Sequence, residues 1–241
     1  MSWAGRTLES AIVLGASGGI GAATIARLSE CCSRVVAVGR RFDSSIARSD
    51  RVEFREWSGM SRAELLRVLG DEERFSLVVN CVGVGFFSPL PGDFEAQWEE
   101  MLSTNILGLA NVCSILAGRP ERFEHFIHIS SLAAVRPSRS PGSLMYSVSK
   151  SSAVPLLAQF RNELRASGSR IKVTSVTPGF VGETRFGERY FAAQPGAAVD
   201  LFARFAPLAP ADVAELVAFA ALAPSHVEIN DLVCRPVEQP D

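Results

Sequence analysis

Short apolar runs alternate with amphipathic stretches along the whole chain. Residues 11–14 and 35–38 are continuously apolar and contain several valines, which is typical of buried strands. Between such runs, apolar residues recur at helical spacing, as at Leu65, Leu66 and Leu69. Strands that alternate with helices indicate βαβ units and a parallel sheet. We predict strands at residues 11–14, 34–38, 51–55, 76–80, 125–130, 170–177 and 231–234, and helices at 20–31, 61–69, 93–117, 146–166 and 212–222.

The predicted sheet needs helices on both of its faces. Parallel strands that are covered on both sides are continuously apolar, as most of these runs are. Residues 51–55 alternate charged and apolar side chains instead, which favours a place nearer an edge of the sheet. Right-handed crossovers favour a doubly wound arrangement. The pattern therefore predicts an α/β fold: one domain over residues 1–241, with a doubly wound, mostly parallel seven-stranded sheet and helices on both faces.

Composition and charge exclude several classes of partner. The 241 residues are 47% hydrophobic and 21% charged, and their formal net charge is −2, so we expect neither a nucleic-acid nor a membrane partner. The five cysteines form no even-numbered framework, and His125, His128 and His226 show no metal-ligand spacing, so no metal is expected. The first ten residues lack a signal-peptide core, and no apolar run reaches the ~20 residues that span a bilayer. These features predict a cytoplasmic protein.

A glycine-rich turn joins the first predicted strand to the first predicted helix. It reads Gly15-Ala16-Ser17-Gly18-Gly19-Ile20-Gly21, a Gly-x-x-x-Gly-x-Gly spacing. Glycine lets the backbone turn tightly and come close to a pyrophosphate. The free N–H groups at the N-terminus of the following helix attract that anion. The turn is therefore predicted to bind the phosphates of a dinucleotide, with Ser17, Gly18 and Ile20 included in the contact.

The end of the second predicted strand favours NADP(H) over NAD(H). In dinucleotide-binding folds an acidic residue at this place accepts hydrogen bonds from the adenosine ribose, and it would repel a 2′-phosphate. Here Gly39 occupies that place, and Arg40 and Arg41 follow it. Glycine leaves room for the phosphate, and the planar guanidinium of Arg40 suits it, with the Ser17 hydroxyl as a further contact. The alternative is that both arginines are solvated loop charges.

A tyrosine, a lysine and a serine form a candidate catalytic group. Tyr146 and Lys150 are four residues apart on a predicted helix, so they project from one face. A free tyrosine, with a pKa of ~10, is a poor acid or base at neutral pH, and a nearby ammonium and an oxidised nicotinamide would both lower that pKa. Tyr146 would then exchange a proton with a substrate oxygen while hydride moves to or from the nicotinamide. Ser131 or its neighbour Ser130, at a strand end, would hydrogen-bond the same oxygen.

Together these motifs resemble the short-chain dehydrogenase/reductase family over nearly the whole chain. Gly15, Gly19 and Gly21 match the glycine motif of the family, and Tyr146-Ser-Val-Ser-Lys150 matches its Tyr-x-x-x-Lys signature. The segment Asn80-Cys81-Val82-Gly83 keeps two of the four residues of its Asn-Asn-Ala-Gly motif. The resemblance implies a Rossmann-type fold and an NADP(H)-preferring carbonyl reductase.

The resemblance also implies roles for individual residues. It assigns the serine role to Ser131 and places Lys150 on the nicotinamide ribose. It implies that Asn105 holds a water molecule that links Lys150 to solvent. The alternative is a structural role for Asn105, as a polar residue that bends its helix. The positions that it places at the cofactor are Asn80, Gly83, Tyr146, Lys150, Pro178 and Gly179.

Family members bind substrate under a variable segment, which here covers residues 180–210 or so. Aromatic side chains in this segment suit a carbonyl or alcohol substrate with an apolar body. Its arginines would clamp a carboxylate or a phosphate, unless they face solvent, as arginines on such helices more often do. The aromatic residues are Phe186, Tyr190, Phe191, Phe202 and Phe205, and the arginines are Arg185, Arg189 and Arg204.

Two local features bear on specificity and assembly. The loop from Ser131 to Tyr146, which contains Pro137 and Arg139, is about two residues longer than is usual in the family. Pro155 is expected to bend the helix beyond Lys150 without disturbing the Tyr-Lys pair. Family members commonly pair this helix with the copy in a partner subunit, so the resemblance implies a homodimer or homotetramer. In agreement with this, the helix is apolar on more than one face, at Val154, Leu156, Leu157, Phe160 and Leu164.

Two alternative functions compete with a carbonyl reductase. One is a binding protein that senses the cofactor without chemistry, but such relatives commonly lose the tyrosine and lysine. The other is an epimerase or dehydratase, whose relatives are usually longer and carry Gly-x-x-Gly-x-x-Gly. The sequence therefore predicts an NADP(H)-dependent oxidoreductase that interconverts a ketone or aldehyde and an alcohol. It does not name the substrate or the direction of the reaction.

Overall fold

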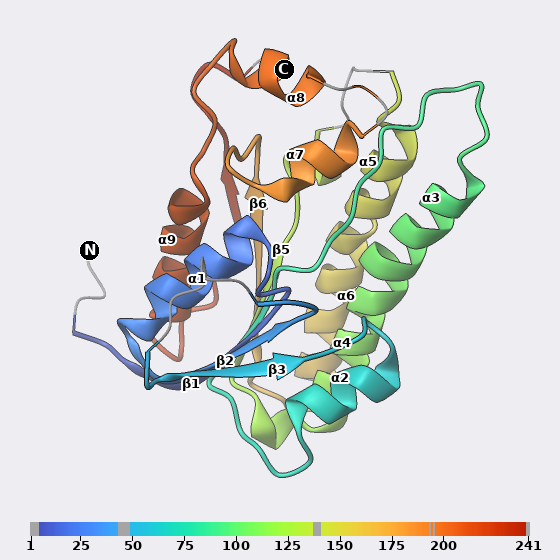
Figure 1. The fold of residues 1–241 in the computed structure, drawn as a ribbon. Helices are drawn as coiled ribbons and strands as arrows, with labels where there is room; N and C mark the ends of the chain where they lie inside the picture. Colours follow the sequence, from blue (N-terminus) through green and yellow to red (C-terminus); the bar gives the residue numbers. More distant parts are fainter. Residues whose placement is uncertain (1–4, 43–48, 137–140, 193, 195, 240–241) are drawn as a thin grey trace.

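Seven parallel strands form one sheet in the order β3-β2-β1-β4-β5-β6-β7 (Figure 1). In this computed structural model, the structure describes residues 5–42, 49–136, 141–192, 194 and 196–239. The α/β prediction is confirmed, with a sheet that is wholly parallel, and β3 lies at its edge as expected. The extent of the domain stays a prediction. The strands are β1 (Leu8–Leu14), β2 (Cys32–Gly39), β3 (Val52–Glu56), β4 (Leu77–Asn80), β5 (His125–Ile129), β6 (Lys172–Pro178) and β7 (Asp231–Cys234).

Helices cover both faces of the sheet because successive residues of each strand point to opposite sides (Figure 1). Ala11 and Val13 of β1 belong to the core cluster that includes side chains of α1 (Gly19–Ser29) and α9 (Pro210–Ala221). Ile12 and Leu14 belong to the opposite cluster. That second cluster includes side chains of α2 (Arg62–Leu69), α4 (Gly108–Gly118) and α6 (Ala153–Ala166).

The long helix predicted at residues 93–117 is divided by a wider turn. It consists of α3 (Glu95–Met101), the π-helical segment η1 (Leu102–Leu107) and α4. Among the described residues, the run Glu95–Gly118 is one candidate membrane span by length and mean hydropathy (1.5), which the sequence analysis did not count. Core helices have the same length and composition. Here the apolar side chains of α4, including Val112, Ile115 and Leu116, are buried in the core on the face of the sheet that α4 covers.

The helix predicted at residues 146–166 is also divided. It forms α5 (Leu144–Ser151) and α6, with Ser152 between them. Pro155 has no N–H to donate to the carbonyl of Ser151, so the helical hydrogen-bond ladder is interrupted at this point. The interruption follows Lys150, and the Tyr-Lys pair lies in the regular part of α5.

The carboxyl ends of the strands meet at one edge of the sheet. Connections from β1 and β4 leave in opposite directions, and ligands of open α/β sheets bind in the crevice formed there. The glycine turn follows β1 at this edge, and Ser131 lies just after β5. Two short helices, α7 (Arg185–Tyr190) and α8 (Ala197–Phe202), lie over the same edge (Figure 1).

Candidate active site

A cavity of about 1980 Å³ opens at the carboxyl edge of the sheet. The glycine turn, the strand ends, α5 and α7 all contribute to its walls, so segments that are far apart in the sequence meet here. Asn80 and Asn105 are not among the described residues that line it. The predicted site residues that do line it are Gly15, Ser17, Gly18, Gly19, Ile20, Gly21, Arg40, Arg41, Gly83, Ser131, Tyr146, Lys150, Pro178 and Gly179.

The glycine turn is glycine-rich because neighbouring backbone comes very close to it. Gly15 has a φ of 85°, a left-handed conformation that favours glycine. A side chain at Gly21 would place its Cβ only 2.3 Å from the carbonyl oxygen of Gly15. A Cβ at Gly19 would lie 2.8 Å from the side chain of Thr184, which precedes α7. The turn therefore presents bare backbone at the N-terminus of α1, the geometry that a pyrophosphate requires.

The end of β2 lies beside the same turn. A Cβ at Gly39 would lie 3.3 Å from both the backbone nitrogen and the hydroxyl of Ser17, so a larger residue there would crowd the turn. Arg40 and Arg41 follow, both exposed and both lining the cavity. The Ser17 hydroxyl, next to Gly39, and the two arginines therefore lie at this end of the cavity, the types of group that suit a 2′-phosphate.

Tyr146 lies at the other end of the cavity, where its hydroxyl is hydrogen-bonded to the side chain of Ser131. The Ser131 hydroxyl also accepts a hydrogen bond of 3.3 Å from the backbone of Ala133. The hydroxyl of Ser130 is buried and has no hydrogen-bond partner among the described residues. The geometry therefore favours Ser131 over Ser130 as the serine that works with Tyr146, although both line the cavity.

Burial controls the pKa values of the catalytic candidates. Burial raises the pKa of Tyr146 well above its ordinary value, and the hydrogen bond from Ser131 offsets only part of this effect. Burial also lowers the pKa of Lys150, to about 8. The expected lowering of the tyrosine pKa by Lys150 is therefore not produced by the protein groups alone. A further positive charge in the cavity is needed to favour the phenolate.

Asn105 and Asn80 shape the wall of the site from behind. Asn105 lies in the π-helical turn η1, accepts a hydrogen bond from the backbone N–H of Val84 (2.9 Å) and donates to the carbonyl of Val84 (2.8 Å) and to Ser149 (3.0 Å). Asn80 accepts from the backbone N–H of Val82 (3.1 Å). These amides hold the loop after β4, and the water that the resemblance assigns to Asn105 stays a prediction.

Gly83, in that loop, lies against the side chain of Lys150. A Cβ at position 83 would be 2.6 Å from Nζ of Lys150. The loop that Asn80 and Asn105 hold therefore packs directly against the ammonium group of Lys150. This explains why glycine is needed at a position that the sequence analysis linked only to cofactor binding.

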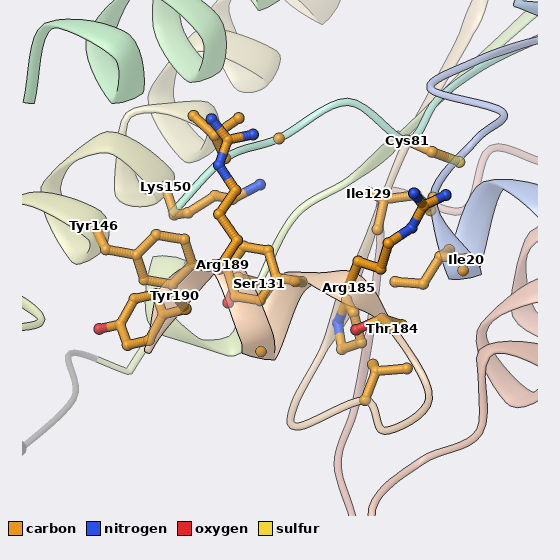
Figure 2. A pocket seen from close by; sticks show the side chains of 18 of the residues that line it. Ile20, Cys81, Ile129, Ser131, Tyr146, Lys150, Thr184, Arg185, Arg189 and Tyr190 are labelled. Atoms are coloured by element: carbon orange, nitrogen blue, oxygen red, sulfur yellow. The ribbon is translucent and has the colours of Figure 1, made fainter. Parts of the chain in front are cut away.

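An aromatic cluster covers Tyr146 from the side of α7 (Figure 2). The rings of Tyr146 and Tyr190 lie 5.4 Å apart in an edge-to-face arrangement, and Phe186 stacks on Tyr190 at 5.8 Å. The Tyr190 hydroxyl donates to Ser143 (2.9 Å), and the backbone N–H of Phe87 donates to the carbonyl of Tyr190 (2.9 Å). The aromatic side chains of α7 therefore lie over Tyr146 and give this part of the cavity an apolar lining, and substrate binding beneath the segment stays a prediction.

Two of the three arginines of this segment, Arg185 and Arg189, contact other parts of the protein, while Arg204 is exposed. Arg185 donates to the carbonyl of Ser17 in the glycine turn (3.1 Å). Arg189 forms an ion pair with Glu100, and its guanidinium lies 4.8 Å from the ring centre of Phe86. Figure 2 shows both side chains among those that line the cavity.

The motifs of a single family thus occur along the chain, and most of their residues line the cavity. A family model for "short chain dehydrogenase" matches residues 9–195. The chain belongs to the short-chain dehydrogenase/reductase family. It is an oxidoreductase of that family with a Rossmann-like, all-parallel sheet.

Relatives and solved structures of the short-chain dehydrogenase/reductase family match nearly the whole chain. An NADP-dependent 3-hydroxy acid dehydrogenase of Shigella flexneri is 30% identical and covers 95% of each chain. Dehydrogenase/reductase SDR family member 11 of Bos taurus is 28% identical, over 95% of this chain and 96% of the relative. The closed form of a serine dehydrogenase complexed with NADP+ has a TM-score of 0.86 and 28% identity, over 96% of each chain.

Several residues of the cavity escaped the sequence analysis. Phe87 follows the motif after β4, Ser143 precedes α5, and Gln239 comes from the C-terminal tail. The Gln239 side-chain oxygen accepts a hydrogen bond from the backbone N–H of Phe180 (2.9 Å). None of these residues belongs to a motif that the sequence displays. In the extended loop before Tyr146, Pro137 and Arg139 lie outside the described residues.

Proposed function

We propose that this protein is an NADP(H)-dependent oxidoreductase that interconverts a ketone or aldehyde and the corresponding alcohol. The observation that carries the proposal is the Tyr146 hydroxyl, hydrogen-bonded to Ser131 and one helical turn from Lys150. This group lies in the cavity that begins at the glycine turn, so a dinucleotide bound at the turn would extend toward it.

The residues present fit a nicotinamide dinucleotide. The glycine turn and the N-terminus of α1 would hold the pyrophosphate, and Lys150 and the Pro178-Gly179 turn line the end where the nicotinamide ribose would lie. When bound, the nicotinamide supplies or accepts the hydride. Its oxidised form carries the positive charge that would lower the raised pKa of Tyr146.

The chain's own groups then handle the proton and the substrate oxygen. In reduction, the Tyr146 hydroxyl donates its proton to the carbonyl oxygen, and in oxidation the phenolate takes it back. Ser131 orients the same oxygen and stabilises the charge that develops on it. The aromatic cluster of Phe186 and Tyr190 keeps water away and favours a substrate with an apolar body.

The preference for NADP(H) is supported by Ser17, Arg40 and Arg41, which line the cavity, and by Gly39, which lies beside Ser17. The absence of an acid at Gly39 removes the group that would repel a 2′-phosphate. The similar 3-hydroxy acid dehydrogenase is named NADP-dependent, and the similar serine dehydrogenase is in complex with NADP+. Together these observations favour NADP(H) over NAD(H).

The exposed apolar side chains near α5 support a homodimer or homotetramer. Leu107, Leu144, Val148 and Val154 are exposed on η1, α5 and α6. Other apolar residues of α6 that suggested a partner helix, such as Leu157, Phe160 and Leu164, are buried in the chain's own core. The exposed set is therefore the surface that we propose for self-association.

A substrate panel with NADPH or NADP+, followed by absorbance, tests the function. The panel starts with 3-hydroxy acids, because a similar relative is named for them, and continues with apolar ketones. Replacing Tyr146 with Phe should leave cofactor binding, measured by NADPH fluorescence, nearly unchanged while kcat falls by about 100-fold or more. A variant that keeps more than about a tenth of the wild-type rate would show that Tyr146 is not the acid/base.

A further inference from the structure

A second cavity, of about 270 Å³, lies at the amino-terminal edge of the sheet, opposite the catalytic edge. Its walls come from the starts of β1, β5 and β6 and from the end of α9. Among the residues that line it are Arg6, Arg170 and Lys172, against one acid, Glu124. The cavity therefore combines an enclosed volume with an excess of positive charge.

Lys172 is the centre of this charge. Its side chain is largely buried, and burial lowers its pKa, with a further lowering from the nearby charge of Arg6. Within the described parts of the chain, neither Arg6, Arg170 nor Lys172 forms an ion pair. Glu228, the other acid near Lys172, is already bound to Arg165 (3.0 Å).

One ammonium hydrogen of Lys172 is used by the fold. Nζ donates to the carbonyl of Ala223, just beyond the end of α9 (3.1 Å). The positive charge of Lys172 therefore lies close to the C-terminal end of α9, where a cation is favourable. An ammonium has three hydrogens, so two remain for a ligand in the cavity.

His125 supplies the second feature of the cavity. The Thr174 hydroxyl gives its proton to the carbonyl of Ile229 (2.6 Å), so its oxygen accepts from Nε2 of His125 (2.8 Å). The proton of the neutral ring therefore lies on Nε2, and Nδ1 carries a lone pair. His125 is buried, lines the cavity, and its Nδ1 has no hydrogen-bond partner among the described residues. A buried acceptor of this kind needs a donor.

We propose that this cavity binds inorganic phosphate, with Lys172, Arg6 and Arg170 around its charged oxygens and its remaining O–H group donating to Nδ1 of His125. The cations alone would accept any small oxyanion. The lone pair of His125 selects an anion that still carries a proton at neutral pH, as hydrogen phosphate does and sulfate does not. The site is separate from the dinucleotide cavity and does not depend on the proposed reaction.

Isothermal titration calorimetry with phosphate and with sulfate tests the proposal, at matched ionic strength and with saturating NADP+ to fill the dinucleotide site. We expect phosphate to bind about tenfold or more tightly than sulfate, because sulfate leaves His125 unpaired. Equal affinity for the two anions would overturn the proposal.

Variants locate the binding. The double change Arg6→Gln and Arg170→Gln removes two exposed cations, and Lys172→Met replaces the ammonium with an uncharged chain of similar length. Each should weaken phosphate binding about tenfold or more. Arg62→Gln, an exposed arginine of α2, is the matched control and should bind as the wild type does. The double variant changes only exposed residues, so it tests the phosphate site even if the Lys172→Met protein does not fold. Unchanged phosphate affinity in the double variant would place the anion elsewhere and refute the site.

Discussion

Replacing Gly83 with alanine should disturb the catalytic lysine without disturbing the fold. The new Cβ would lie 2.6 Å from Nζ of Lys150, whereas ordinary contact begins at 3.4 Å, so the ammonium must move by roughly 1 Å. The other atoms near this Cβ, Cε of Lys150 and Oδ1 of Asn105, are both at 3.5 Å and need not move. The clash is with the end of a flexible side chain, so the protein can relieve it locally.

The expected result is a large loss of rate with little change in stability. A displacement of ~1 Å at a catalytic group costs about 100-fold in rate, so kcat of the Gly83→Ala enzyme should fall by about that factor. Its Tm should stay close to that of the wild type. Steady-state kinetics on the best substrate of the panel, together with thermal unfolding, measure both quantities.

Gly118→Ala is the matched control, because a Cβ at this last residue of α4 would meet no atom within 4 Å. That enzyme should keep the wild-type kcat. If the Gly83→Ala enzyme instead keeps kcat within about threefold of the wild type, the position of the Lys150 ammonium does not limit the reaction, and the catalytic assignment built on it fails.

Three further results follow from the same geometry. Ser131→Ala should lower kcat by less than Tyr146→Phe does, and Ser130→Ala by less again, and steady-state rates with the two serines in the opposite order would reverse the serine assignment. Arg40→Asp should shift kcat/KM toward NAD(H) by at least about tenfold, ~1.4 kcal/mol, while an unmutated enzyme that used NADH as well as NADPH would contradict the proposed phosphate contact. Light scattering at micromolar concentration should give a dimer or tetramer, and a mass near 25.9 kDa would rule out self-association.

The sequence by itself determined the features that depend on residues close together in the chain. The glycine turn could be predicted because Gly15, Gly19 and Gly21 recur at a short, recognisable spacing between a strand and a helix. The local backbone itself leaves no room for a side chain at Gly21, whereas residues distant in the sequence crowd Gly15 and Gly19. The Tyr146 and Lys150 pair could be read because residues four apart share a helix face whatever surrounds the helix. Short apolar runs predicted the strands, and their alternation with helical patterns predicted the parallel sheet, because both are patterns of neighbouring residues.

Only the tertiary structure decided the features that depend on contacts between segments far apart in the sequence. The protein groups alone raise the pKa of Tyr146, because burial among Phe186, Tyr190 and the sheet edge outweighs the hydrogen bond from Ser131. The lowering expected from an oxidised nicotinamide stays a prediction. The role of Gly83 follows from its distance to a lysine 67 positions later in the chain. Desolvation and close contact depend on the packing of distant segments, which no local pattern contains.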